Sequence, residues 1–84
     1  MALHLAVVRG GNNHTKVTEN FLLTQVDVLD ASVWMNDGQL MAHVTLTEGS
    51  RWTAGSLRTT CAKELGLEFT PSEVVLFGAR MRVA

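Results

Sequence analysis

Residues 28–47 read VLDASVWMNDGQLMAHVTLT, and this stretch decides the fold. Its second part, residues 39–47, alternates cleanly between two sets of side chains, which is the two-residue period of a β-strand. Its first part, residues 28–35, alternates in the same way. Between them, Asn36-Asp37-Gly38 tolerates the positive φ angles of a type I′ turn. The stretch therefore predicts a tight β-hairpin.

The segments on either side of the hairpin alternate between strand and helix patterns. Thr15 and Thr53 are suited to cap the two helices at their N-termini, and Gly66 is suited to end the second. The flanking elements are predicted as a strand over 2–8, a helix over 16–25, a helix over 54–65 and a strand over 73–77.

The element order β-α-β-β-α-β predicts one small α+β domain over residues 1–84. We expect a ferredoxin-like two-layer sandwich, with both helices on one face of a mainly antiparallel four-stranded sheet. Its strand order would be 4-1-3-2. The face under the helices would then carry Leu3, Leu5, Val7, Leu40, Ala42, Val44 and Leu46.

The opposite face of this sheet has no cover within the predicted sandwich. Exposed large apolar side chains on a sheet usually mark a contact surface. The face would carry His4, Ala6, Val8, Trp34, Met41 and His43, with His4 beside His43 on neighbouring strands. We predict an interface at His4, Trp34, Met41 and His43, covered by a second copy in a homodimer or by a larger protein; the alternative is the chain's own C-terminal tail.

Composition excludes several classes of function. The chain has 84 residues, and 7 Lys+Arg against 8 Asp+Glu give a formal net charge of −1, which argues against a nucleic-acid partner. No apolar run is long enough to span a membrane, and no secretion signal is visible, so we expect a cytoplasmic protein. A single cysteine excludes an internal disulfide framework. Neither a metal nor a cofactor is expected.

The polar candidates do not form a catalytic set. His4 and His43 lack the third ligand of a zinc site. The turn at residues 10–13, Gly-Gly-Asn-Asn, could bind an anion, but it lacks the Lys-Ser/Thr pair of a P-loop. Cys61 lies on the apolar stripe of the second helix, where a structural role is expected, and His14 is expected at the surface. We predict no catalytic residue and no enzyme activity by this chain alone.

The residue pattern from 9 to 77 resembles the small C-terminal subdomain of adenylate-forming enzymes, which include acyl-CoA synthetases and the adenylation domains of peptide synthetases. The positions that carry the resemblance are Arg9-Gly10, Glu19, Leu22, Val28, Ala31, Val33, Gly38, Leu40, Ala42, Val44, Leu57-Arg58, Leu65, Pro71-Ser72 and Val74-Val75-Leu76. Most of these positions are small or apolar, so the resemblance implies the packing of that subdomain.

The departures from the family pattern concern its chemistry. The family's catalytic lysine follows the last strand in an N-G-K segment, whereas residues 78–82 here read Gly-Ala-Arg-Met-Arg. No lysine follows Lys63, and Arg80 cannot take over its role. The glycine before the family's I-E pair is also missing, as is the large subdomain that holds the nucleotide and acyl pocket. The resemblance therefore does not imply independent adenylation.

Three functions follow from these observations. The leading hypothesis is a non-enzymatic small domain that acts by self-association or by docking on a larger protein. The second is a detached adenylation-type subdomain that works in trans with a large acyl-adenylating subunit. The third is a sensor that binds a small ligand at the dimer edge or on the sheet face.

Overall fold

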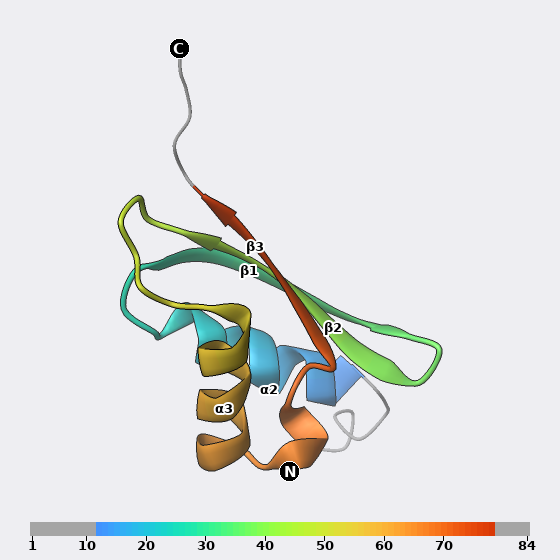
Figure 1. The fold of residues 1–84 in the computed structure, drawn as a ribbon. Helices are drawn as coiled ribbons and strands as arrows, with labels where there is room; N and C mark the ends of the chain where they lie inside the picture. The colour runs from blue at the N-terminus through green and yellow to red at the C-terminus, as the bar shows by residue number, and fades with distance from the viewer. Residues whose placement is uncertain (1–11, 79–84) are drawn as a thin grey trace, which may run out of the picture.

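The structure, a computed structural model, describes residues 12–78 and confirms the predicted α+β class. The predicted strand over 2–8 lies outside the described residues, as does the tail after Gly78. The elements, in chain order, are α2 (Asn12–Leu23), β1 (Val28–Asn36), β2 (Gln39–Leu46), α3 (Ala54–Glu64), a short 3₁₀ helix η1 (Leu67–Phe69) and β3 (Glu73–Gly78) (Figure 1).

The hairpin of β1 and β2 is confirmed. Asn36 and Gln39 are opposite partners, and the two turn residues, Asp37 and Gly38, have φ angles of 53° and 78°. These positive values are those of a type I′ turn, whose twist matches that of the flanking strands. Between Val28 and Asp30 the register shifts, which is the signature of a β-bulge.

The predicted strand order 4-1-3-2 is wrong. The described sheet has three strands in the order β1-β2-β3, with β1 antiparallel and β3 parallel to β2. A β-strand, a crossover helix and a neighbouring parallel strand form a compact unit, and β2, α3 and β3 adopt this arrangement. Because β1 and β3 occupy both edges of β2, no edge of β2 is left for the expected pairing with a strand over 2–8. The expected placement of His4 beside His43 depended on that pairing.

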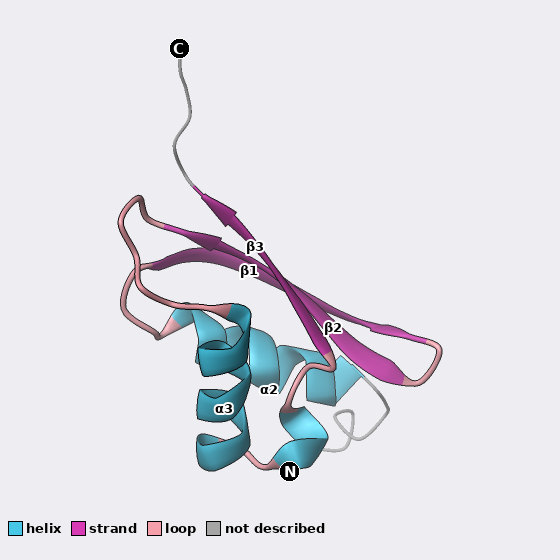
Figure 2. Ribbon diagram, in the orientation of Figure 1, coloured by secondary structure: helices cyan, strands magenta, loops and turns pink. Residues whose placement is uncertain are grey.

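Both helices lie on one face of the sheet, as predicted (Figure 2). The buried core lies between the helices and the sheet. Leu22 of α2 and Leu57 and Cys61 of α3 are almost completely buried. The predicted inward set on β2 is confirmed, since Leu40, Ala42, Val44 and Leu46 are all buried. Leu3, Leu5 and Val7 lie outside the described residues.

Helix α2 differs from its prediction at the N-terminal end. It includes Asn12, so Thr15 lies inside the helix and is not its N-cap. His14, expected at the surface, is half-buried and stacks on Phe69 of η1 with 4.7 Å between the ring centroids. Thr18 is fully buried and donates a hydrogen bond to the Phe69 carbonyl at 2.7 Å. These contacts with η1 stabilise helical turns that local sequence signals do not reveal.

Helix α3 begins at Ala54 as predicted and ends at Glu64, one residue before the predicted end. Thr53 and Ser56 form a reciprocal capping box, in which the Thr53 side chain accepts from the Ser56 amide and the Ser56 side chain accepts from the Thr53 amide. After the C-cap Leu65, Gly66 has a φ of 104°, which a residue with a side chain rarely adopts. Among the described residues, no helix is long and apolar enough to cross a membrane.

Candidate functional site

The side of the sheet turned away from the helices is uncovered by any other part of the described chain. Alternate residues of the three strands face this side, because their neighbours Ala31, Val33, Ala42, Val44 and Val74 are buried under the helices. We call this surface the open face. It consists of Asp30, Ser32 and Trp34 on β1, Met41, His43 and Thr45 on β2, and Glu73, Val75 and Phe77 on β3.

An aromatic row crosses the open face diagonally. Trp34 meets His43 edge to face with 4.6 Å between ring centroids, and His43 meets Phe77 in the same way at 5.1 Å. Each such edge contact contributes about 0.5–1.5 kcal/mol beyond the burial of area, which favours this arrangement of the three rings. Trp34 nevertheless remains 37% exposed and Phe77 45% exposed. The row is therefore both ordered and available for contact.

The structure brings most of the predicted interface residues together. Trp34 and Met41 are direct cross-strand partners, and His43 lies diagonally across from Trp34. His4, Ala6 and Val8 lie outside the described residues.

The prediction missed Val75 and Phe77, which extend the open face onto β3. The alternation over residues 73–77 could have indicated that they share a face. Their place beside β2 could not be inferred, because it depends on the strand order.

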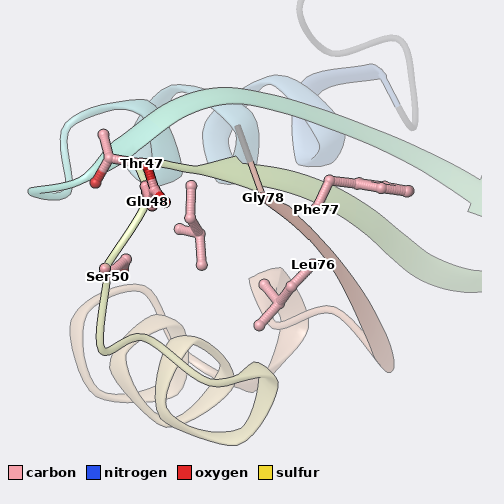
Figure 3. Close-up of a pocket in the computed structure, with 8 residues that line it drawn as sticks. Thr47, Glu48, Ser50, Leu76, Phe77 and Gly78 are labelled. Carbon is pink, nitrogen blue, oxygen red and sulfur yellow. The ribbon is translucent and has the colours of Figure 1, made fainter. Parts of the chain in front are cut away.

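A hollow of about 280 Å³ lies where β2 and β3 end, next to one corner of the open face (Figure 3). Carboxyl ends of parallel strands are common ligand positions in α/β sheets. Its lining consists of Leu46, Thr47, Glu48, Gly49, Ser50, Leu76, Phe77 and Gly78.

The hollow does not contain a catalytic set among these lining residues. No hydrogen bond joins Ser50 to Glu48, the lining has no histidine, and the Ser50 Oγ accepts a hydrogen bond from the Trp52 amide at 3.2 Å. Glu48 is the single charged side chain of the lining. The lining can offer hydrogen bonds and apolar contact to a ligand, but no positive charge.

Trp52 holds the loop before α3 against the rest of the domain. Its Nε1 donates a hydrogen bond to the Val26 carbonyl at 2.7 Å, across 26 residues of sequence. A second, shallower hollow beside it is lined by Val26, Asp27, Arg51, Trp52 and Ser56.

Cys61 is a structural residue in the described domain. It is completely buried, and desolvation by burial raises the pKa of its thiol from 9.0 to about 11. A thiol in this state is a poor nucleophile and a poor metal ligand near neutral pH. Within residues 12–78, no three His, Cys, Asp or Glu side chains gather in a way that could hold a metal ion.

No protein-family model matches the chain, and no curated protein matches it.

Parts of several adenylate-forming enzymes of known structure have a fold similar to that of this chain. An acyl-CoA synthetase from Brucella canis matches with a TM-score of 0.65 and 24% identity, over 74% of this chain and 13% of its own length. The amide bond synthetase McbA from Marinactinospora thermotolerans matches with a TM-score of 0.64 and 22% identity, over 74% of this chain and 14% of its own. A malonyl-CoA ligase, with methylmalonyl-CoA and AMP bound, matches with a TM-score of 0.63 and 23% identity, over 81% of this chain and 16% of its own.

These similarities establish the fold of the chain. They confirm the resemblance to a small subdomain of adenylate-forming enzymes, because this chain corresponds to only 13–16% of each of those proteins. At identities below 25% they do not establish a shared reaction.

Proposed function

We propose that this chain is a small docking domain of an acyl-adenylating system, which acts in trans on a large subunit and supplies contacts rather than catalytic groups. The observation that carries the proposal is the fold match, in which the chain corresponds to 13% of an acyl-CoA synthetase. A domain that forms a small fraction of an enzyme can close over a reaction centre located in the rest of that enzyme. Closure of this kind excludes water from reactive intermediates.

The contacts within the domain support a binding role. The one thiol of the chain is buried, and the hollow at the strand ends has neither a histidine nor a positive charge in its lining. The exposed rings of Trp34 and Phe77, by contrast, are ordered by their contacts with His43. Ordered and exposed aromatic side chains are typical of binding surfaces.

The test uses a large acyl-adenylating subunit from the source organism that lacks a segment of this fold. We expect the chain to copurify with that subunit and to accelerate acyl-thioester formation, measured with ATP, fatty acid and coenzyme A. An intact acyl-CoA synthetase, which already contains its own segment of this fold, is the control and should not be accelerated. Absence of binding at micromolar concentration, together with an unchanged rate, would contradict the proposal.

Self-association through the open face is a second candidate function, favoured by the exposure of Trp34, Val75 and Phe77 on one surface. Light scattering at micromolar concentration would then give twice the monomer mass, and Trp34→Ser would reduce it to that of the monomer. A strictly monomeric chain whose solubility is unaffected by Trp34→Ser would exclude this candidate.

A further inference from the structure

The charges on the described strands have one sign. Asp30 lies at one corner of the open face and Glu73 at the diagonally opposite corner, and neither Lys nor Arg occurs in β1, β2 or β3. The described Lys and Arg side chains belong to the helices and the loop before α3; they are Lys16, Arg51, Arg58 and Lys63. The open face therefore combines an apolar centre with acidic corners.

This charge pattern disfavours a second copy as the occupant. Two open faces packed against each other would bring four carboxylates, two each from Asp30 and Glu73, into one small interface. Like charges at an interface disfavour the pairing, whereas a complementary potential favours it. The surface that complements the open face is apolar at its centre and carries Lys or Arg at its rim.

The size of the open face also points to a larger partner. On β2 the open face runs over the five residues from Met41 to Thr45, a length of about 17 Å, and three strands give a width of about 14 Å, so the face covers on the order of 200 Å². A stable interface buries about 800 Å² per partner. A protein that binds here must therefore extend its contact beyond the open face, onto the edges of the domain.

We propose that the open face is the docking surface for a patch on a larger protein that is apolar at its centre and carries Lys or Arg at its rim. Trp34, His43 and Phe77 are the central contacts. Only the identification of that protein as the acyl-adenylating subunit rests on the proposed function. The surface and the chemistry of the partner rest on the sheet itself. The ring contacts favour one arrangement of the aromatic row, which lowers the side-chain entropy that binding has to remove.

A site-specific crosslink tests the occupant. Ser32 is exposed, lies opposite His43 on the open face, and differs from cysteine by one atom. Ser32→Cys can be labelled selectively with benzophenone maleimide, since Cys61 is buried and its thiol pKa is raised. Thr59→Cys, at an exposed position of α3, is the matched control on the helical layer. Both labelled chains are irradiated at equal concentration in extract of the source organism.

We expect the label at position 32 to join a different protein through a Lys- or Arg-rich peptide, with a yield about tenfold above that at position 59. Raising the salt concentration from about 50 mM to about 500 mM should lower this yield about fivefold, because charge pairs at a rim are screened. Trp34→Ser and Phe77→Ser should each lower it about tenfold. Leu67→Ser, which removes a side chain that is 80% exposed on η1, should leave it unchanged.

The inference would be overturned by a crosslink only to a second copy, by one only to residues 79–84 of the same chain, by equal yields at positions 32 and 59, or by no crosslink at either position. A crosslink from position 32 to a basic protein that forms no acyl-adenylate would uphold the inference and contradict the proposed function. A crosslink from position 59 alone to an acyl-adenylating subunit would contradict the inference and uphold the proposed function. Circular dichroism of each variant shows whether a loss of yield reflects unfolding.

Discussion

At the scale of single residues, the burial of Cys61 gives a testable link between pH and stability. Its thiol pKa is about 11 in the folded chain and 9.0 ordinarily, so above pH 9 the unfolded chain loses a proton that the folded chain keeps. The stabilisation is therefore complete below pH 9 and is lost as the pH rises toward 11. We expect a loss of about 2 kcal/mol at pH 11. Urea unfolding at pH 8 and pH 11 measures it.

Cys61→Ala is the control for this prediction, because it removes the titrating group at the same position. The variant is less stable at every pH, since it leaves a cavity, but it should lack the additional loss between pH 9 and pH 11. An equal pH dependence in the wild type and in Cys61→Ala would show that another group is responsible.

The buried hydroxyl of Thr18 is the second residue-scale prediction. It donates to the Phe69 carbonyl at 2.7 Å and thereby ties α2 to η1. Thr18→Val preserves the shape but leaves that carbonyl without this donor, which should lower the free energy of unfolding by about 1–3 kcal/mol. The matched control is Thr59→Val on the exposed surface of α3, where a change below about 0.5 kcal/mol is expected. Equal urea midpoints for the two variants would contradict the prediction.

At the scale of elements, α3 depends on its capping box. Thr53→Ala removes the acceptor of the Ser56 amide and should lower the free energy of unfolding by about 0.5–2 kcal/mol. Because Thr53 and Ser56 cap each other, the double variant Thr53→Ala/Ser56→Ala should lose less than the sum of the single variants. Thermal unfolding of the three variants measures this difference, and strict additivity would argue against a cooperative cap.

The hairpin turn gives a second prediction at this scale. Gly38 has a φ of 78°, and a Cβ built there has no atom within 4 Å, so the cost of Gly38→Ala comes from backbone conformation alone. That cost is about 1–2 kcal/mol. At Gly78, where there is equal space and no left-handed φ, Ala should be neutral or slightly stabilising. Chemical unfolding measures the stability of both variants. A larger loss of stability for Gly78→Ala than for Gly38→Ala would contradict this account.

At the scale of the whole molecule, the sheet order predicts how backbone protection is distributed. Within residues 12–78, β2 is paired on both sides, whereas β1 and β3 each have one edge without a strand partner. Amide hydrogen exchange should therefore be slowest along β2 and faster at the outward-facing amides of β1 and β3. Equal protection of the outward amides of β3 would show that a further strand pairs with that edge.

Local sequence signals were sufficient for the elements whose ends depend on nearby residues. Asp37-Gly38 predicted the turn, Thr53 and Gly66 marked the limits of α3, and the alternation over 39–47 identified the buried side of β2. The start of α2 and the existence of η1 were not predicted. Both depend on contacts between residues that are 51 or more positions apart in sequence, such as the hydrogen bond from Thr18 to the Phe69 carbonyl.

The same division applies to the candidate surface. Trp34, Met41 and His43 were predicted together because they lie on the two strands of one hairpin, where the turn sets the register. Phe77 was missed because its neighbour depends on which edge of β2 the last strand joins.

The sequence alone determined the hairpin, the second helix and the inward side of β2, since each depends on residues close together in the chain. It also determined the resemblance to a subdomain of adenylate-forming enzymes, which depends on a pattern of small and apolar positions. The tertiary structure decided the parallel pairing of β3 with β2 and, through it, the diagonal contact of Trp34, His43 and Phe77. Strand order has no local sequence signal, because it depends on how α3 packs across the sheet and which edge this leaves for the next strand.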